Sequence, residues 1–373
     1  MKYDIMLMMN TRERVKNIFK NSNVDIDSII IKNGHEQYID TNFFYVTGIS
    51  KGLFEDCCLV LFPDGTIHMI VTALESDIAK DADADIHIFQ SRKEMENILK
   101  DILVNVNSIG VNESAILHSD YQWISTNFKE KKMENVIASF HKSRMIKEPD
   151  ELRSIKKACG IADQVMDEIS NYIKKNMTEN ELAAEIDYHL QKYGAQNPAF
   201  DTIASFGANT AMPHYTHDQS KLKEGDFILC DFGASFDKYN SDMTRTFVYG
   251  SASDKQKKIH ETVRIAQQKA MMAIKPGIKA NIVHQQAKSY IDSSSFKDCF
   301  IHSTGHSLGI SVHDPGVGFY ASCEELLKEN MVITVEPGIY VQGYGGVRIE
   351  DDVVITKEGC TSLTKSQRTL QEI

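Results

Sequence analysis

Residues 222–233 read LKEGDFILCDFG, and residues 327–338 read LKENMVITVEPG. Offset by 105 positions, the two stretches agree at five of twelve residues. Each is an apolar run typical of a buried strand, and each ends in an acid, Asp231 in the first copy and Glu336 in the second. Because an ionised carboxylate is costly to bury without a partner, two strands that end in this way indicate a partner common to both acids.

Each copy continues into a second strand that carries a second acid. Asp242 follows Asp231 in the segment NSDMTRTFV, and Glu350 follows Glu336 in GGVRIEDDVVI. The residues between the strands include the polar and glycine residues expected of hairpin turns. The sequence therefore predicts two related hairpins with two acids each, and a pseudo-two-fold packing of these hairpins would bring four carboxylates to one point.

Four carboxylates cannot all stay ionised in one pocket without cations, because like charges within a few ångströms raise one another's pKa. Two divalent metal ions balance four acids in formal charge, and a metal pair is a recurring hydrolytic device. The alternative for any single acid is an exposed strand end. The duplication of the pair favours the metal interpretation.

A nitrogen ligand is expected between the hairpins, where residues 300–314 read FIHSTGHSLGISVHD. This segment holds His302, His306 and His313. It is not the H-E-x-x-H pattern of a zincin helix, because no acid follows His302. His214, in GANTAMPHYTHD before the first hairpin, is a weaker candidate. A lone histidine is more often a core or surface residue, whereas three in one segment favour a site.

The length of the chain indicates two domains. At 373 residues it exceeds the size at which a single hydrophobic core usually keeps growing. Pro149, a residue suited to the first turn of a helix, marks the boundary, and the expected domains are residues 1–145 and 146–373. A hydrophobic fraction of 42% with 25% charged residues is typical of globular proteins. The net charge of -11 argues against a nucleic-acid partner, which favours a basic surface.

Targeting signals and cysteine chemistry are not expected. The first ten residues, MKYDIMLMMN, contain an apolar run too short for the core of a signal peptide, and no later run approaches the length of a membrane span. We therefore expect a cytoplasmic protein with no membrane contact. Seven cysteines lie scattered without the paired spacing of a zinc site, so we expect reduced, mostly buried thiols.

The N-terminal domain alternates short strands with helices, which indicates an α/β fold with a covered sheet. The expected strands are residues 28–32, 57–62, 66–71, 85–90, 108–112 and 134–140. The expected helices are residues 12–19, 73–82, 91–103 and 119–128. We find no motif with catalytic spacing in this part of the sequence.

The second domain is expected to consist of helices and hairpins in series. Helices are predicted at residues 149–175, 254–274 and 280–291. A further helix is predicted after Thr178, which forms a T-x-x-E capping box with Glu181. Gly194 is placed to end that helix.

Five motifs occur in order along the second domain: FDTIASFGANTAMPH, DFGASFDKYNSDMTRTF, HSTGHSLGISVHD, VEPGIY and GGVRIEDDV. Together they resemble the pita-bread metallopeptidases, specifically the Xaa-Pro peptidases prolidase and aminopeptidase P, over residues 149–370. The resemblance implies an α+β pita-bread catalytic domain with an internal pseudo-two-fold repeat. In TNFFYVTGI and its PDG turn, the first domain resembles the smaller creatinase-type α/β domain that precedes the catalytic one.

The resemblance also implies a metal ligand set. Asp231 would bind one of two divalent metal ions, and His306 and Glu336 would bind the other. Asp242 and Glu350 would bridge both ions, and Glu336 would also shuttle a proton. Oxygen donors with one nitrogen and no sulfur suit Mn²⁺, Co²⁺ or Zn²⁺ and do not choose among them.

The remaining site residues are implied to lie on the substrate side. They are His214, His302, His313 and Arg348. His214 and His313 are expected to stabilise the charged intermediate of the reaction. Arg348 is also expected to hold an acid in place by a charge-assisted hydrogen bond. In one departure from many relatives, which have glutamate there, His313 is followed by Asp314.

We therefore expect a metallo-exopeptidase that cleaves the bond between an N-terminal residue and proline, in Xaa-Pro dipeptides or in peptides with proline at the second position. A methionine-aminopeptidase-like exopeptidase is an alternative, although such relatives usually lack the N-terminal domain. A metal-free, creatinase-like enzyme and a non-catalytic binding protein are further alternatives, which the complete ligand set disfavours. The relatives are often dimers, so a homodimer is expected.

Overall fold

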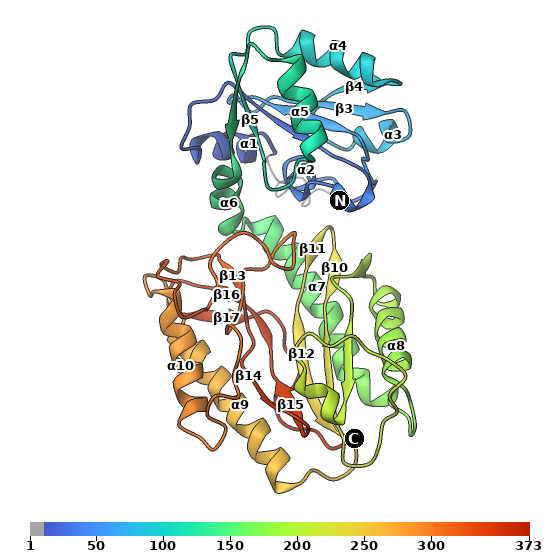
Figure 1. Cartoon of the computed structure of the whole chain (residues 1–373), viewed down its shortest axis with the longest axis vertical. Helices are drawn as coiled ribbons and strands as arrows, with labels where there is room; N and C mark the ends of the chain where they lie inside the picture. The colour runs from blue at the N-terminus through green and yellow to red at the C-terminus, as the bar shows by residue number, and fades with distance from the viewer. Residues whose placement is uncertain (1–10) are drawn as a thin grey trace, which may run out of the picture. The chain divides into compact units, whose positions relative to one another are not determined.

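The computed structural model describes residues 11–373, which form two compact units. One unit ends at Arg144, and the other comprises Met145–Ile373 (Figure 1). The expectation drawn from the first ten residues, MKYDIMLMMN, falls outside the described part of the chain. No helix within residues 11–373 is both long and apolar enough to cross a membrane.

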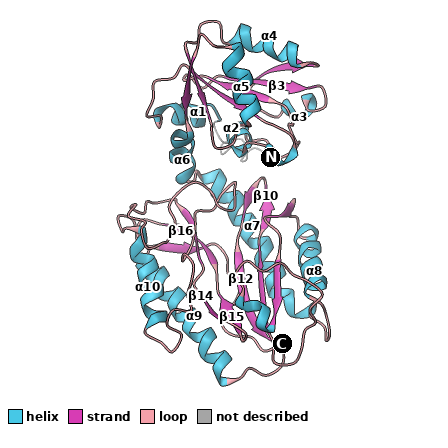
Figure 2. Ribbon diagram, viewed as in Figure 1, coloured by secondary structure: helices cyan, strands magenta, loops and turns pink. Residues whose placement is uncertain are grey.

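The N-terminal unit is an α/β fold built on one six-stranded sheet (Figure 2). In chain order its elements are α1 (Thr11–Lys20), β1 (Ser28–Lys32), η2 (Glu36–Tyr38), α2 (Thr41–Thr47), β2 (Cys58–Leu61), β3 (Ile67–Thr72), α3 (Ser76–Ala79), β4 (Asp85–Phe89), α4 (Arg92–Ile102), β5 (Ser108–Val111), α5 (His118–Asn127), β6 (Lys132–Asn135) and α6 (Ile137–Met145). The strand order is β4-β3-β2-β1-β5-β6, so β4 and β6 are the edge strands. The sheet is mixed, because β2 is antiparallel to both of its neighbours and the other pairs are parallel.

Local sequence accounts for these elements. β1 reads SIIIK and is buried along its whole length, as expected of a strand covered on both faces. α4 begins after Ser91, whose hydroxyl accepts a hydrogen bond from a backbone N–H of the first turn. Met95 and Leu99, four residues apart on α4, reach the same core cluster as the sheet.

Two expectations for this unit are wrong in part. The segment 134–140 was expected to be a strand, but β6 ends at Asn135, whose side-chain oxygen accepts a hydrogen bond from Ile137 N at 2.9 Å and starts α6. The helix expected at 73–82 is confined to α3. Residues 73–75, the start of the expected helix, form a turn instead, and the Ser76 hydroxyl donates to Ala73 O at 2.9 Å.

The C-terminal unit carries the repeated hairpins. In chain order its elements are α7 (Pro149–Glu168), η3 (Ile169–Asn171), α8 (Glu179–Lys192), β7 (Asn197–Pro198), β8 (Ile203–Phe206), η4 (Gly207–Ala211), β9 (Phe227–Phe232), β10 (Ala234–Phe236), β11 (Tyr239–Asn240), β12 (Met243–Val248), α9 (Asp254–Ala273), α10 (Ala280–Asp292), β13 (Val332–Val335), β14 (Gly338–Val341), β15 (Gly345–Arg348), β16 (Asp351–Ile355) and β17 (Cys360–Ser362).

Each sequence repeat forms a long hairpin whose strand pairing is interrupted in the middle. In the first hairpin β9 pairs with β12, and further along β10 pairs with β11. In the second, β13 pairs with β16 and β14 with β15. The first hairpin turns at Asp237 and Lys238, whose positive φ angles of 49° and 67° are those of a type I′ turn. At its interruption, a Cβ on Gly233 would lie 1.8 Å from Ser241 O, so only glycine fits there.

The four acids lie at or beside these interruptions. Asp231 is the penultimate residue of β9, and Asp242 directly precedes β12. Glu336 directly follows β13, and Glu350 directly precedes β16. Because regular pairing stops at these points, the acids are not held to the strict alternation of a continuous ladder and can point into one cavity.

Each half of the C-terminal unit has its own hydrophobic core. In the first half, α7 and α8 pack with β8, β9 and β12 around residues such as Ile186 and Phe232. In the second half, α9 and α10 pack with the second hairpin around residues such as Val263 and Ile333. Figure 1 shows the strands of both halves between α8 at one edge and α9 and α10 at the other. The expected α+β fold with an internal repeat is confirmed.

The capping box expected from the sequence is present at the start of α8. Thr178 Oγ1 accepts from Glu181 N at 3.2 Å, and Glu181 Oε2 accepts from Thr178 N at 2.8 Å. We predict that Thr178→Ala lowers the free energy of unfolding by about 1 kcal/mol, whereas Thr178→Gly costs only about a few tenths. The shift in urea midpoint at constant m-value measures both losses. Equal losses in the two variants would contradict this account of the cap.

Candidate metal centre

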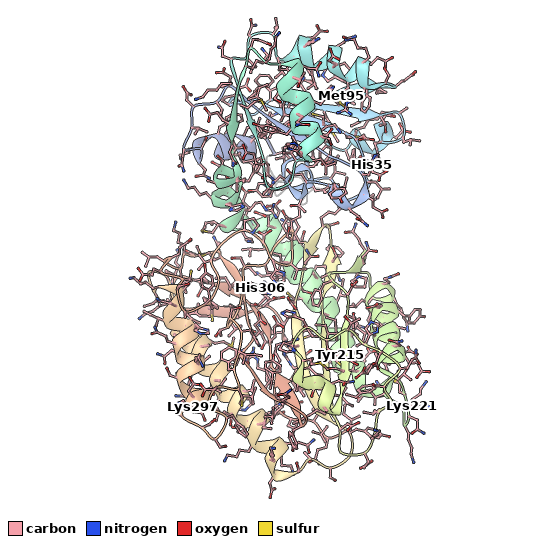
Figure 3. All side chains as sticks on the ribbon, viewed as in Figure 1. His35, Met95, Tyr215, Lys221, Lys297 and His306 are labelled. Carbon is pink, nitrogen blue, oxygen red and sulfur yellow. The ribbon has the colours of Figure 1, made fainter. Side chains whose placement is uncertain are left out.

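One cavity of about 280 Å³ in the C-terminal unit gathers the site residues expected from the sequence. It is lined by Asp231, Asp242, Glu336, Glu350, His214, His302, His306, His313 and Arg348 (His306 is labelled in Figure 3). Four apolar residues, Phe200, Ile203, Pro213 and Val312, and Ser303 complete its lining. Acids, imidazoles and an apolar surface thus share one cavity.

Three of these residues form a cluster with the spacing of metal ligands. Ligand atoms of Asp242, His306 and Glu350 lie within 4.8 Å of one another. His306 Nε2 is 3.5 Å from Asp242 Oδ2 and 3.6 Å from Glu336 Oε1, so Glu336 extends the cluster. An acid of the first hairpin and two acids of the second therefore meet at one imidazole.

The fourth acid, Asp231, lies beside a buried arginine. Arg348 Nη2 donates to Asp231 Oδ2 at 2.5 Å, and Arg348 Nε donates to Thr244 Oγ1 at 2.9 Å. Arg348 Nη1 donates to the Tyr340 hydroxyl at 3.0 Å, and His302 Nε2 lies 2.8 Å from the same hydroxyl. The guanidinium and the Tyr340 hydroxyl therefore connect the carboxylate of Asp231 to the ring of His302.

Burial and mutual repulsion disfavour the ionised acids in this cavity. Burial, reinforced by the charges of Asp231 and Glu336, raises the pKa of Asp242 from 3.8 to about 7. Burial and the charge of Asp242 raise the pKa of Glu350 well above its ordinary value. Burial lowers the pKa of His306, but the neighbouring carboxylates outweigh it and raise the value to about 9. The cavity thus retains protons that divalent cations can displace.

Unpaired oxygens also indicate that the cavity fits metal. Within residues 11–373, no hydrogen-bond donor reaches Oδ1 of Asp231 or Oδ1 of Asp242, although both atoms are buried. Buried polar atoms are nearly always paired, so each of these oxygens is available to a cation. Carboxylates with one imidazole and no thiolate are a donor set for divalent metals. The residues present therefore fit divalent metal ions.

Two supporting residues were missed by the sequence analysis. Thr244 Oγ1 donates to Glu350 Oε2 at 2.6 Å, and Thr244 O accepts from Glu350 N at 3.1 Å. Asp352 Oδ2 accepts from Asp242 N at 2.9 Å and from the Cys159 thiol at 3.3 Å. Each supporting residue lies two positions after a site acid. The two-residue period of strands is the signal that could have identified them.

A buried arginine on β12 fixes the strand that follows Glu350. Arg245 Nη2 lies 2.8 Å from Asp351 Oδ1, and both side chains are almost fully buried. Arg245 Nη1 donates to Glu350 O at 2.5 Å, and the guanidinium also donates to Ser366 O at 2.8 Å and Gln367 O at 3.0 Å. Arg245 thus connects the first hairpin, the second hairpin and the C-terminal segment.

His214 lies on a loop that a buried carboxylate holds. Glu179, at the start of α8, accepts hydrogen bonds at Oε1 from Phe206 N at 2.7 Å and from Asn209 Nδ2 at 3.0 Å. Its Oε2 accepts from Asp218 N at 3.2 Å. These contacts hold both ends of the loop of residues 209–218, so Glu179 positions the loop that contains His214.

The segment that bears His306 and His313 is fixed by a buried ion pair. Lys147 Nζ lies 3.1 Å from Asp314 Oδ2, and each side chain is 1% exposed. The rings of His306 and His313 pack with centroids 4.2 Å apart. Asp314, the departure noted in the sequence, therefore has a partner of its own and anchors the segment directly after His313.

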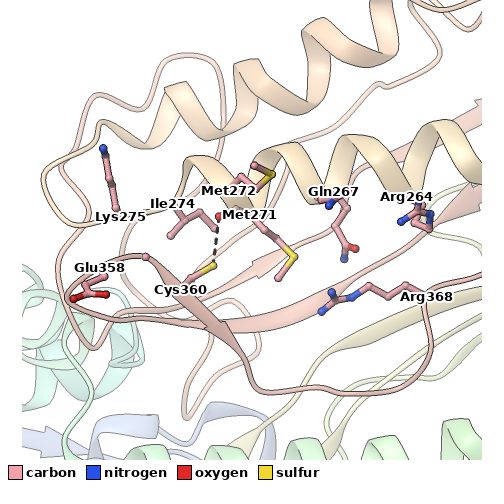
Figure 4. A pocket seen from close by; sticks show the side chains of 11 residues that line it. Arg264, Gln267, Met271, Met272, Ile274, Lys275, Glu358, Cys360 and Arg368 are labelled. Atoms are coloured by element: carbon pink, nitrogen blue, oxygen red, sulfur yellow. Dashed lines mark hydrogen bonds between the residues drawn. The ribbon is translucent and has the colours of Figure 1, made fainter.

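A larger cavity, of about 490 Å³, lies along α9 and β17 (Figure 4). In its wall, Gln267 and Arg368 donate to Asp351 Oδ2 at 2.7 and 2.6 Å. Glu358 is the one carboxylate among its lining residues, which include no histidine. Gln267 and Arg368 in this wall hold Asp351, the first residue of β16, directly after Glu350. The lining residues do not form a metal centre.

Known proteins match this chain over both units. Residues 153–357 match the model of Metallopeptidase family M24, and residues 12–146 match that of the Creatinase/Prolidase N-terminal domain. A relative named Xaa-Pro dipeptidase, from Pyrococcus horikoshii, is 38% identical over 366 residues, which are 96% of this chain and 98% of the relative.

Solved structures show the same similarity. An X-Pro aminopeptidase from Thermotoga maritima matches with a TM-score of 0.88 at 30% identity, covering 93% of this chain and 98% of that structure. A prolidase from Pyrococcus horikoshii matches with a TM-score of 0.86 at 32% identity, covering 96% of this chain and 99% of that structure. Each match therefore includes both the N-terminal unit and the unit with the cavity.

The charges in the cavity predict how pH changes the stability of metal-free protein. The pKa values of Asp242 and His306 are raised to about 7 and about 9, so the folded state binds more protons than the unfolded state. The contribution of Asp242 to the free energy of unfolding is therefore lost as pH rises from 3.8 through about 7. The contribution of His306 is lost as pH rises from 6.5 through about 9. We predict that the Tm of chelator-treated protein falls between pH 5 and pH 9.

Added metal and one variant serve as controls for this prediction. Added Mn²⁺ should remove most of the fall in Tm between pH 5 and pH 9, because a cation stabilises the ionised acids. Asp242→Asn keeps the shape of the side chain and removes one titrating group, so its metal-free Tm should fall less between pH 5 and pH 7. A metal-free wild-type Tm that rises with pH over the full range would overturn this account.

Proposed function

The chain belongs to metallopeptidase family M24, and from its relatives and its cavity we propose that it hydrolyses the peptide bond between an N-terminal residue and proline. It is a metallo-exopeptidase with a pita-bread catalytic domain and a creatinase-type N-terminal domain. One observation carries the proposal: the cluster of Asp242, His306 and Glu350 shares its cavity with three further histidines and an apolar wall.

The enzyme uses divalent metal ions, and we assign its ligands to two of them. Asp231 would hold one ion, and His306 with Glu336 would hold the other. Asp242 and Glu350 would bridge both. The short distances among Asp242, His306 and Glu350 support this division, as do the unpaired oxygens of Asp231 and Asp242. Mn²⁺, Co²⁺ and Zn²⁺ all suit the donor set.

Cations held in this cavity supply Lewis acidity at the scissile carbonyl and water that ionises near neutral pH. The chain itself would supply proton transfer through Glu336. Thr334 Oγ1 donates to Glu336 Oε1 at 3.2 Å and so fixes the carboxylate. Glu336 Oε2, 3.9 Å from His302 Nδ1, would accept a proton from the attacking water and return it to the proline nitrogen.

The other histidines would stabilise charge and orient the substrate. Burial and the charge of His306 lower the pKa of His313, so a neutral ring with one N–H donor faces the cavity. His214 and His313 are the proposed donors to the carbonyl oxygen as negative charge develops there. Arg348 donates to Asp231 and Tyr340, which supports a positioning role for it, and its direct contact with substrate stays a prediction.

The cavity wall supports proline and a short substrate. Phe200, Ile203, Pro213 and Val312 offer an apolar surface for the proline ring. The volume of about 280 Å³ lies just below the usual range of ligand pockets, which starts at roughly 300 Å³. We therefore favour Xaa-Pro dipeptides over longer peptides. The matched relatives carry both names, Xaa-Pro dipeptidase and X-Pro aminopeptidase.

Three further expectations from the sequence concern assembly, location and specificity. The homodimer and the cytoplasmic location stay predictions, which light scattering and cell fractionation test. A methionine-aminopeptidase-like specificity is disfavoured, because residues 12–146 match the Creatinase/Prolidase N-terminal domain. Substrate comparison decides this last point directly.

We predict that metal-loaded protein cleaves Ala-Pro faster than Ala-Ala or Met-Ala, because proline fits the apolar wall beside the histidines. Chelator should abolish cleavage of Ala-Pro, and added Mn²⁺ or Co²⁺ should restore it. Release of free proline measures the rate, and Ala-Pro-Ala in the same assay separates dipeptidase from aminopeptidase activity. Equal or faster cleavage of Met-Ala would refute the proline preference, and full activity in metal-free protein would refute the metal requirement.

Two variants separate metal ligands from catalytic groups. Asp242→Ala removes a proposed bridging carboxylate, so bound metal per chain, metal-linked thermal stability and kcat should all fall. His214→Ala should keep its metal and its Tm while kcat falls on the order of 10²–10⁴-fold. Elemental analysis and kinetics on the same preparations measure both effects. A His214→Ala variant that loses metal, or that keeps wild-type kcat, would remove His214 from the proposed role.

A further inference from the structure

One polar side chain interrupts the apolar face that α10 buries. The buried residues of α10 are Ala280, Val283, His284, Ala287 and Ile291. His284 is 7% exposed, and burial together with the charge of Lys288 lowers its pKa, so the imidazole is neutral at pH 7. A buried polar group is costly unless it is hydrogen-bonded, so the partner of this ring indicates what the residue does.

The partner of His284 is Thr304, in the segment between His302 and His306. His284 Nδ1 lies 2.9 Å from Thr304 Oγ1, and both residues are buried. The imidazole also packs against Phe300, with ring centroids 5.7 Å apart. Phe300 packs in turn against His302, with centroids 5.0 Å apart. One side chain of α10 therefore contacts the histidine segment at two points.

Thr304 lies at the end of a short backbone ladder that holds two proposed metal ligands. Thr334 N donates to His306 O at 2.9 Å. Two residues further along, Glu336 N donates to Thr304 O at 2.8 Å. A Cβ on Gly305 would lie 1.8 Å from Thr334 O, so the two segments approach too closely for any other residue. These backbone contacts hold His306 and Glu336 in register with each other.

Three hydrogen bonds fix Thr304 at this end of the ladder. Its N–H donates to Phe319 O at 2.7 Å, its carbonyl accepts from Glu336, and its hydroxyl pairs with His284. Of these three, the last joins two side chains, so a substitution can remove it without altering the backbone. Its loss would let Thr304 shift, together with the carbonyl that accepts from Glu336.

We propose that His284 is a positioning residue for Glu336 and acts through Thr304. The inference rests on the proposed function, because it takes Glu336 as a metal ligand and as the group that transfers a proton. Thr334 fixes the carboxylate of Glu336, and the contact between His284 and Thr304 fixes its backbone. Because His306 and Glu336 would bind the same ion, a shift of one against the other weakens the binding of that ion as well as proton transfer.

The test uses His284→Leu, Thr304→Val and the double variant in full-length protein. Titration of chelator-treated protein with Mn²⁺, without peptide, gives the affinity, and Ala-Pro hydrolysis by metal-saturated protein gives kcat and KM. Each single variant should bind one ion about 10-fold more weakly, at the lower end of the effect typical of groups behind metal ligands. The lower end is expected because His284 acts through Thr304. The value of kcat should fall by a similar factor, with little change in KM.

A conservative variant should rescue both measurements. His284→Asn places an amide group near the position of Nδ1, so it can still pair with the Thr304 hydroxyl. Its Mn²⁺ affinity and kcat should therefore lie closer to wild type than to His284→Leu. An asparagine variant as impaired as the leucine variant would contradict the role of the hydrogen bond.

Thermal stability separates positioning from a merely structural role. Each single variant leaves one buried polar group unpaired and should have a lower Tm, whereas the double variant removes both groups and should recover most of that loss. Its Mn²⁺ affinity should stay as low as in the single variants, because the contact is still absent. The proposal is overturned if affinity recovers together with Tm in the double variant, or if His284→Leu keeps wild-type affinity.

His189→Leu is the matched control. His189 is also a buried imidazole on a helix, 8% exposed on α8, and its ring stacks on Tyr172 with centroids 4.0 Å apart. This variant should keep wild-type Mn²⁺ affinity and kcat whatever its Tm, and a loss as large as that of His284→Leu would refute the proposal. If wild-type protein leaves Ala-Pro intact, the proposed function fails, and the Mn²⁺ affinities measured without peptide still decide the role of His284.

Discussion

Excess negative charge in one buried cavity is the constraint on which the catalytic unit depends. Four carboxylates line it against one guanidinium, that of Arg348, and the imidazole of His306, whose pKa is raised to about 9, and burial makes such an imbalance costly. The raised pKa of Asp242 records that cost in the protein without metal. Metal ions that bind the folded state therefore contribute to its stability as well as to its chemistry. The surrounding groups, among them Thr244 and Asp352, hold the acids in position but do not neutralise them.

The repeat divides this centre between two halves, and neither half completes it. Each half has its own helices and its own core, yet the backbone N–H groups of two of the acids, Asp242 and Glu350, are satisfied by the opposite hairpin. The N–H of Asp242 donates to Asp352 in the second hairpin, and the N–H of Glu350 donates to Thr244 in the first. Because these hydrogen bonds are buried, separating the halves would leave several polar groups unpaired at once. The proposed metal ligands are thus positioned by the interface between two similar modules.

Local signals explain what could be predicted from the sequence. The duplicated strand ends predicted Asp231 and Glu336, and the second strand of each repeat predicted Asp242 and Glu350. The capping box at Thr178 predicted the start of α8, since a cap involves neighbouring residues only. The interrupted pairing of the hairpins and the partner of Asp352 depend on residues distant in sequence, so no local pattern encodes them. The error after Asn135 has a different cause. Its side-chain cap starts a helix in a segment whose β-branched residues favour a strand.

The contacts of Arg245 also imply an order in which parts of the C-terminal unit form during synthesis. Arg245 belongs to the first hairpin, but its acceptors Glu350, Ser366 and Gln367 are all synthesised later. A chain emerging from the ribosome can bury the core of the first half around α7 and α8 before these acceptors exist. It cannot assemble the complete set of carboxylates at that stage. Because Glu350 is the last of the four acids along the chain, the complete cavity can form only after the second hairpin has been synthesised.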